Sequence, residues 1–274
     1  MLYKYKNPMS KNNFRKDFSR GLAAFTGVLA FVSQHKMWKF FVVPALLTLL
    51  LFGGVFFGAW TLSPKLVGWL GDVTNYEDMN FKGAGKLIQL INALLSVVLF
   101  ILVLLPFYYL YKIIILTLLS PFLSYVSEKT EFYLTGNKYD FSWNQMGKDV
   151  LRGLRLTGRN LSREIPLTLL FIVLAFVPII GIISPILIFI NSAYFAGMGL
   201  MDPFFERRKK NVKETVVSIR QQRGYALACG AVFNLLIFIP IIGILTAPLI
   251  AVIGTTIGLV KREVGVNLPT NKDV

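Results

Sequence analysis

The fold is decided by a motif that occurs twice, as Phe176-Val-Pro-Ile-Ile-Gly-Ile-Ile-Ser-Pro185 and again as Phe238-Ile-Pro-Ile-Ile-Gly-Ile-Leu-Thr-Ala-Pro248. The two copies are 62 positions apart, and each lies in the middle of a long apolar segment. Proline and glycine close together interrupt a helix and turn the chain. Each copy therefore predicts the turn of a helical hairpin.

The arms of the two predicted hairpins, 165–201 and 225–260, are short. Each arm has about 12–14 residues, or roughly 18–21 Å at the helical rise of 1.5 Å per residue. The hydrocarbon core of a membrane is about 30 Å thick. We therefore predict two re-entrant hairpins that enter the membrane and return to the same side. Two pairs of full spans would give the same sidedness, so complete crossing remains the alternative.

Two further uncharged segments, 40–62 and 87–111, are long enough to cross a membrane upright. Apolar character continues after the second of them to about residue 126. That helix therefore projects beyond the membrane with Lys112 near the boundary, or it bends at Pro106. Two long transmembrane helices and two Pro/Gly-broken hairpins make an all-α integral membrane protein.

The composition supports a membrane protein and argues against an ordinary soluble enzyme. Hydrophobic residues make up 55% of the chain and charged residues 16%, where soluble domains carry about 25% charged residues. The net charge of +15 suits basic loops that face an anionic cytoplasmic leaflet. A nucleic-acid-binding protein can share this charge but does not need so many apolar residues, so no nucleic acid partner is expected.

The N-terminal segment, 1–39, carries eight basic residues and one acidic residue. Its apolar side chains recur at helical spacing, at Phe18, Leu22, Phe25 and Leu29. This pattern predicts an amphipathic helix that lies in the membrane interface on the cytoplasmic side. A signal peptide is the alternative, but no small-x-small cleavage site follows the short apolar run.

The distribution of basic residues predicts the orientation in the membrane. The loops 127–164 and 202–224 each carry seven Lys or Arg, whereas 63–86 carries three together with three acids. By the positive-inside rule, both termini and the two basic loops are cytoplasmic and 63–86 is outside. We thus expect a multi-pass protein of the inner (plasma) membrane, with a single membrane domain at 40–262 and a short tail at 263–274.

The chain has few residue types that catalyse reactions or bind metals. Cys229 is the only cysteine and His35 the only histidine, so no disulfide, metal site or histidine-based triad is expected. The sequence contains no phosphate-binding P-loop, so we expect no ATP hydrolysis by this chain. We expect neither a cofactor nor enzymatic activity. Glu128 and Glu131 can form an acid/base pair, although pairing with Lys129 or with nearby arginines is the commoner arrangement.

Polar residues inside the hairpins are candidates for contact with an anion. Ser184 is placed to cap a helix that starts with Pro185, which would point free N–H groups into the membrane. The alternative is that the Pro/Gly tips only turn the chain. Asn191 and Asn234 lie on hairpin arms, where helix–helix hydrogen bonding is the default and a pore-lining position the alternative.

Arginines precede the first hairpin at regular helical spacing. They form one stripe of a helix and are Arg152, Arg155, Arg159 and Arg163. Such a stripe either binds lipid phosphates or draws an anion toward the hairpins. A run of four basic residues at 207–210 predicts an anchor on the cytoplasmic side that contacts lipid.

Several motifs together resemble the CysZ sulfate permeases and the wider etoposide-induced protein family, over roughly residues 18–262. One is Ser120-Pro-Phe-Leu-Ser-Tyr-Val-Ser-Glu-Lys-Thr-Glu131 with Leu134-Thr-Gly136. Another is the arginine stripe before an apolar hairpin. The third is Asp202-Pro203, a basic helix, and then Ile239-Pro240 through Gly254-Thr-Thr256.

The resemblance implies two long membrane helices, two half-penetrating hairpins, a homo-oligomer and the passage of sulfate. The permeases carry a Gly-Leu-Arg sulfate motif before the first span, where this chain has the segment 33–40 without it. Lys36 and Lys39 in that segment can still contact an anion. We expect passage of sulfate or a related oxyanion, with contacts from Lys36, Lys39, Arg152, Arg155 and Ser184. The alternative is a non-transporting module that binds membrane lipids or partner proteins.

Overall fold

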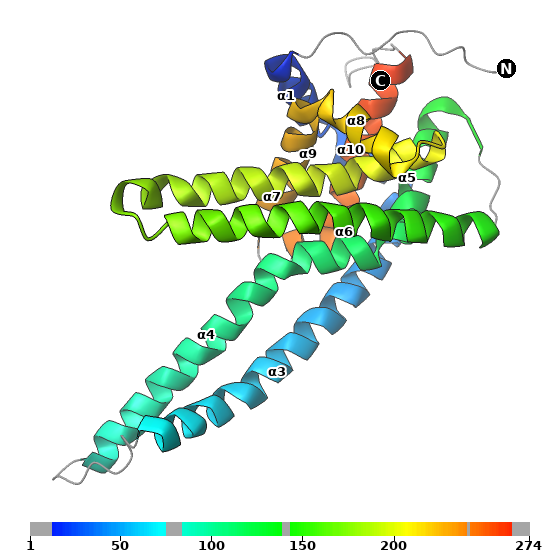
Figure 1. Cartoon of the computed structure of the whole chain (residues 1–274). Helices are drawn as coiled ribbons and strands as arrows, with labels where there is room; N and C mark the ends of the chain where they lie inside the picture. The colour runs from blue at the N-terminus through cyan, green and yellow to red at the C-terminus, as the bar shows by residue number, and fades with distance from the viewer. Residues whose placement is uncertain (1–12, 75–83, 139–142, 240–241, 265–274) are drawn as a thin grey trace. The chain divides into compact units, whose positions relative to one another are not determined.

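The computed structural model describes residues 13–74, 84–138, 143–239 and 242–264, and all regular structure within these ranges is helical (Figure 1). Three helical stretches among them are long and apolar enough to cross a membrane: Met37–Val73, Gly181–Arg207 and Ile242–Val264. The prediction of an all-α membrane protein is confirmed.

The chain packs as two compact units, one formed by residues 1–45 and 115–274 and the other by residues 46–114. The second unit contains most of α3 (Val42–Thr74) and α4 (Ala84–Leu118), which touch where the rings of Phe56 and Phe100 are 5.5 Å apart. The predicted loop at 63–86 is shorter than expected, because α3 continues through Pro64 to Thr74. The domain limits at 40–262 and 263–274 stay predictions.

The apolar segment 87–126 contains a break, but not at Pro106, where a bend was the alternative prediction. Helix α4 runs to Leu118, and α5 (Ser120–Thr135) follows after Leu119, with a proline in its first turn. A proline at a helix start loses no hydrogen bond and presets the backbone angle. Pro121 therefore sets the break. Helix α5 ends at Gly136, whose φ of 74° is the left-handed conformation that glycine adopts without strain.

The first hairpin is formed by α6 (Trp143–Leu174) and α7 (Pro178–Arg207), which run side by side in Figure 1. The turn is confined to three residues, Ala175–Val177. Val177 is extended and Pro178 occupies the first turn of α7. With 32 and 30 residues, both arms are much longer than predicted, because the helices continue beyond the apolar segment at both ends.

Ser184 lies within α7 and does not cap a helix, so that prediction is wrong. Pro185 lies next to it inside the helix and does not end it. A proline inside a helix normally costs a hydrogen bond and kinks the chain, but helices of membrane proteins tolerate it when neighbouring groups satisfy the backbone. Since α7 starts six positions earlier, the first proline of the motif turns the chain and the second is accommodated.

The second hairpin consists of α9 (Arg223–Ile237) and α10 (Ile242–Val264). Its predicted turn residue, Pro240, lies outside the described residues. Helix α9 has 15 residues, close to the predicted arm, but α10 has 23 and continues through Pro248. Because α7 and α10 are both long enough to cross, the argument from short arms is wrong for them. Re-entry stays a prediction.

The two hairpins meet where α7 packs against α9, and the packing is close. A Cβ added to Gly197 would collide with the carbonyl oxygen of Ala226, and one added to Gly230 would collide with that of Ala193. Small residues allow helix backbones to approach in this way inside membranes. The core of the first unit is built around this contact.

The N-terminal segment forms α1 (Phe14–Ala23) and α2 (Val28–Gln34), which are separated at Gly27, where φ is 82°. The predicted apolar face packs against the protein only in part, since Phe18 and Phe25 are half-buried. Small side chains such as Gly21 and Ala24 face inward, whereas Leu22 and Leu29 are exposed. The reason is that Gly21 fits against Ala228 and Tyr225 of α9, where a bulky side chain has no room. Its location in the membrane interface stays a prediction.

Candidate anion-binding site

The four arginines of the predicted stripe on α6 have different surroundings in the folded protein. Arg152 points inward, where its guanidinium pairs with Asp202 of α7 at 2.7 Å and donates to the Thr215 hydroxyl at 2.7 Å. Thr215 belongs to α8 (Val212–Arg220). Arg155 is exposed. Arg152 therefore joins three helices, and its predicted role as an anion contact stays a prediction.

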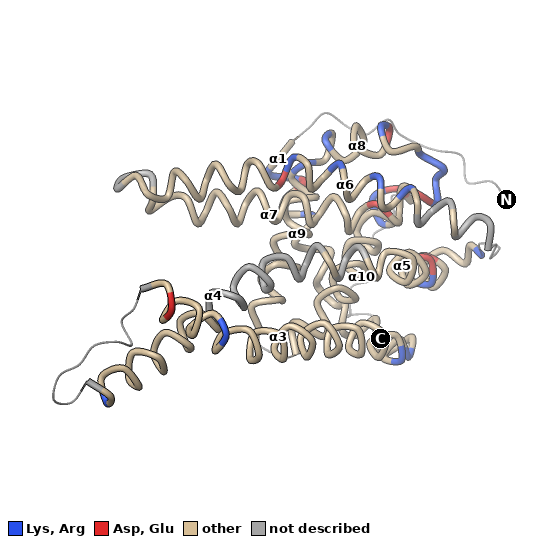
Figure 2. The backbone as a smooth tube through the Cα atoms, turned by 60° about the horizontal axis from the view of Figure 1, so that its bottom comes forward, with Lys and Arg blue, Asp and Glu red and all other residues tan. Residues whose placement is uncertain are grey.

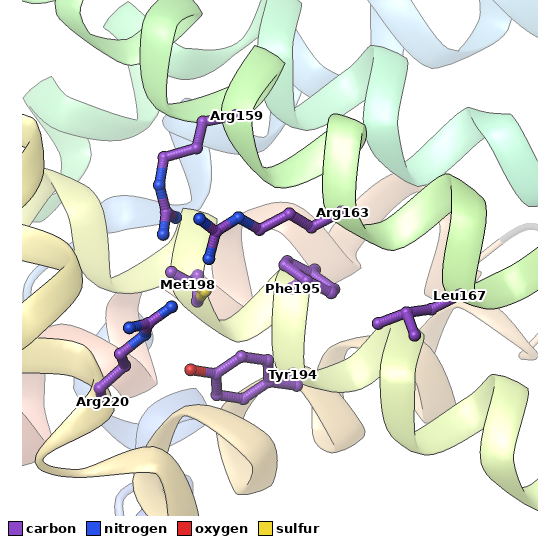
Figure 3. Close-up of a pocket in the computed structure, with 7 residues that line it drawn as sticks. All are labelled: Arg159, Arg163, Leu167, Tyr194, Phe195, Met198 and Arg220. Carbon is purple, nitrogen blue, oxygen red and sulfur yellow. The ribbon is translucent and has the colours of Figure 1, made fainter.

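The next two arginines of the stripe, Arg159 and Arg163, line a pocket between α6, α7 and α8. Arg220, the last residue of α8, enters from the other side, and Tyr194 comes from α7. Figure 3 shows the three guanidinium groups turned toward a common space, with the hydroxyl of Tyr194 facing Arg220. The cavity has a volume of about 340 Å³, at the lower end of the range for small-ligand sites.

Positive charge in this pocket is not balanced by its lining. Among the described side chains, no carboxylate lines the cavity or forms an ion pair with Arg159, Arg163 or Arg220. Partial burial lowers the pKa of Arg159, and the charges of Arg163 and Arg220 lower it further. The hydroxyl of Tyr194 is within electrostatic range of the same three arginines and of Arg223. The pocket therefore favours an anion.

The opposite wall of the pocket is apolar. It is formed by Leu167 from α6 and by Phe195 and Met198 from α7. Phe195 and Met198 are buried, whereas Leu167 is 41% exposed. In Figure 2 the turn end of the α6–α7 hairpin carries no charged residue, and the charged residues of α6 begin near α8. The pocket thus lies where the uncharged hairpin meets the basic part of the chain.

Helix α8 is positioned by its own sequence. Asn211 caps it through a reciprocal pair of hydrogen bonds, in which its side chain accepts from the Glu214 N–H and the Glu214 carboxylate accepts from the Asn211 N–H, both at 2.9 Å. Such a capping box fixes where a helix begins. Arg220 then falls in the last turn. The cap and the basic residues of 202–224 could have identified this helix, but no spacing rule connects Arg220 with Arg159.

Lys36 and Lys39 lie outside the pocket. Both are exposed, and Lys36 has a left-handed backbone with φ of 52°. The ammonium group of Lys39 is 5.4 Å from the centre of the Phe40 ring. They and Arg155 remain available to solvent or to an anion, and their predicted role as anion contacts stays a prediction.

The polar residues of the hairpin arms hold helices together. Asn191 of α7 donates to the carbonyl oxygen of Glu164 at 3.2 Å and to the hydroxyl of Thr168 at 3.1 Å, both on α6. Asn234 of α9 donates to the hydroxyl of Ser192 on α7 at 3.1 Å. Both asparagines are buried. The geometry agrees with helix–helix hydrogen bonding, and a pore-lining role stays a prediction.

A buried ion-pair network connects α5, α7 and α10. Glu131 accepts from Arg207 at 2.9 Å and from Arg208 at 3.1 Å, and Arg208 also binds Glu263. Glu131 therefore pairs with neither Lys129 nor the α6 stripe. Glu128, on the same helix, is half-buried, and burial raises its pKa although Arg207 and Lys129 oppose this.

The predicted lipid anchor at 207–210 is wrong for its two arginines. Their side chains are only 7% and 12% exposed, because Arg207 and Arg208 are turned into this network. Lys210 donates to the Ser218 hydroxyl at 2.8 Å, and only Lys209 of the four is exposed. No pattern in the sequence indicates that the carboxylate of Glu131, far away in the chain, faces this run.

A second ion pair fixes the N-terminal segment. Asp17 of α1 is buried and forms an ion pair with Arg262 of α10 at 3.1 Å, and Arg262 also donates to the Gln222 side chain at 2.8 Å. The sequence does not predict this pair, because Asp17 is the one acid of a basic segment and Arg262 lies far from it in the chain.

No metal or cofactor site emerges from the residues described by the structure. They include no group of three His, Cys, Asp or Glu side chains able to hold a metal ion. Cys229 is buried in α9 and has no disulfide partner.

A chain whose described residues form only helices, several of them apolar and of membrane-spanning length, is an integral membrane protein. The model of one protein family, described as sulfate transporter CysZ/etoposide-induced protein 2.4, matches residues 24–248. The chain belongs to this family, as the sequence motifs indicated. The match includes all of the residues that line the three-arginine pocket.

Proposed function

We propose that this chain is a membrane transport protein that passes sulfate or a related oxyanion across the membrane. The observation that carries the proposal is the family match over 24–248. The unbalanced positive charge near the basic end of the first hairpin supports it. Passage would depend on attraction and hydrogen bonding without a covalent step, and the chain would hydrolyse no ATP and catalyse no reaction.

The proposed orientation places the basic loops and both termini in the cytoplasm of a cell whose inner membrane holds the protein. By the positive-inside rule, the segments 127–164 and 202–224 face inward, so the pocket arginines lie at the cytoplasmic mouth. Lys36, Lys39 and Arg155 add exposed positive charge that would concentrate anions there. Membrane lipids and further copies of the chain are the proposed partners.

The test is uptake of radiolabelled sulfate into liposomes that contain the purified protein, with phosphate and chloride as competitors. We expect saturable uptake that unlabelled sulfate suppresses and chloride does not. The variants Lys36→Gln, Lys39→Gln and Arg155→Gln should each reduce uptake at low ionic strength. If folded protein gives only the uptake of empty liposomes, the proposal fails. If uptake is intact in all three variants, these residues are not the contacts.

A second candidate function is a non-transporting module that binds lipids or partner proteins. It is favoured by the segment 33–40, which lacks the Gly-Leu-Arg motif of the sulfate permeases. Background sulfate uptake, together with retention of anionic lipid through purification, would establish this function instead.

A further inference from the structure

We infer that the three-arginine pocket is a binding site for one tetrahedral oxyanion group, held by Arg159, Arg163 and Arg220 with the hydroxyl of Tyr194. The identity of the bound anion rests on the proposed function. The ability of the pocket to bind an anion does not. It assigns the site to residues on α6, α7 and α8, away from the segment 33–40.

The first argument is convergence. The guanidinium groups come from two helices that are far apart in sequence, yet all three line one cavity (Figure 3). A guanidinium group presents several N–H donors in a planar fork that fits the oxygen atoms of sulfate, phosphate or carboxylate. Three forks and a phenol hydroxyl around one space can reach oxygen atoms on several sides of a tetrahedral group.

The second argument is that this arrangement lacks a counter-charge. Elsewhere in the first unit, inward-turned arginines such as Arg152, Arg207 and Arg208 have carboxylate partners within 3.1 Å. Among the residues that the structure describes, the half-buried Arg159 and the exposed Arg163 and Arg220 have none, and the one hydrogen bond of Arg159 is to the Asn160 side chain at 3.3 Å. Burial lowers the pKa of Arg159, and the like charges of Arg163 and Arg220, which converge on it without a counter-ion, lower it further. A bound anion removes the repulsion among these like charges.

The third argument is the mixed character of the walls. Phe195 and Met198 close one side with buried apolar surface, and charge-assisted hydrogen bonds are stronger where water is partly excluded. Leu167 continues the apolar surface outward along α6. The pocket can therefore hold a free oxyanion such as sulfate or the phosphate of an anionic lipid whose acyl chains lie along the hairpin.

Binding of sodium sulfate to the full chain, purified in an uncharged detergent, tests the site by isothermal titration calorimetry at fixed ionic strength. Loss of one charge-assisted contact in Arg159→Gln, Arg163→Gln or Arg220→Gln should weaken binding roughly ten- to hundredfold. Tyr194→Phe should weaken it less. The matched control is Lys213→Gln, which removes the same charge from an exposed position on α8 outside the pocket. Circular dichroism and a melting curve establish that each variant is folded.

Equal weakening by Lys213→Gln and Arg159→Gln would show a general charge effect and overturn the site. To identify the source, native mass spectrometry compares protein from nanodiscs of phosphatidylcholine with protein from nanodiscs that also contain phosphatidylglycerol. Sulfate binding that depends on Arg159 supports a free anion. Retained phosphatidylglycerol that Arg159→Gln releases supports a lipid phosphate. If neither ligand depends on the pocket arginines, the inference is wrong.

The outcome is separable from that of the proposed function. Pocket-dependent binding without sulfate uptake would preserve the site and refute transport. Saturable uptake in Arg159→Gln at the wild-type rate, with unchanged binding, would preserve transport and refute the site.

Discussion

The substitution Glu131→Gln, which removes the negative charge of a buried carboxylate on α5, should destabilise the protein strongly. The carboxylate is buried, with 3% of its side chain exposed, and it accepts from both Arg207 and Arg208. In Glu131→Gln the shape is kept, but two buried guanidinium groups lose their shared negative partner. Removing one member of a buried ion pair costs about 3–5 kcal/mol.

The structure indicates the lower end of this range. Arg208 keeps Glu263 as a partner, and Arg207 keeps its hydrogen bond to the Ser127 hydroxyl at 2.9 Å. A loss of about 3 kcal/mol corresponds to a fall in melting temperature of about 6–12 °C for a chain of this size. The measurement is thermal unfolding in detergent micelles, followed by intrinsic fluorescence at neutral pH.

Glu128→Gln is the matched control, because it makes the same change one turn earlier on the same helix. Glu128 forms no ion pair among the described side chains. If Glu131→Gln melts within about 2 °C of the wild-type protein, a difference of less than about 1 kcal/mol, the buried network does not stabilise the fold and the reasoning is refuted.

Three further predictions test the packing and the ionisation of the first unit. Gly230→Ala should lower the melting temperature sharply, since overpacking costs about 1–3 kcal/mol or more where the new methyl meets the backbone of Ala193; Gly53→Ala, with open space around it, should not, and equal melting would contradict the close α7–α9 packing. Asn191→Leu should lower it by only about 2–4 °C, because interhelical hydrogen bonds in membranes contribute about 0.6 kcal/mol each; loss of sulfate flux at unchanged stability would instead place Asn191 on the pathway. Burial raises the pKa of Glu128, so its ionisation opposes folding as pH rises through that pKa. Glu128→Gln should therefore stabilise the protein at neutral pH but not below the pKa of Glu128 in the unfolded state. A stability difference from the wild type that is constant across pH would refute this.

The hairpin fold could be predicted because its signal is local. The repeated Pro/Gly motif lies at the turn, and Pro178 begins the second arm. The lengths of the hairpin helices could not be predicted, because each motif contains two prolines and the sequence does not show which of them ends a helix. Pro185 and Pro248 lie inside helices, where the surrounding packing decides whether the chain turns.

The candidate site was predicted only in part. Spacing alone placed Arg159 and Arg163 on one face of a helix with Arg152 and Arg155, but the anion contacts predicted from the sequence were Arg152 and Arg155, not the two arginines that line the pocket. Spacing could not separate these two from Arg152, because that separation depends on Asp202, 50 positions further along the chain. Arg220 and Tyr194 come from other helices, and their convergence depends on tertiary packing, which periodicity does not contain.

The contact between α7 and α9 also limits how the protein can move. Gly197 and Gly230 place backbone against backbone, so no layer of side chains lies between the helices there to repack gradually. One helix can slip along the other only in steps of a whole helical turn, about 5.4 Å. Helices α7 and α9 should therefore move together as a rigid body. They should also contain the amide hydrogens that exchange most slowly with solvent. Any opening that admits an anion must then occur at the other two hairpin arms, α6 and α10, or at their connections.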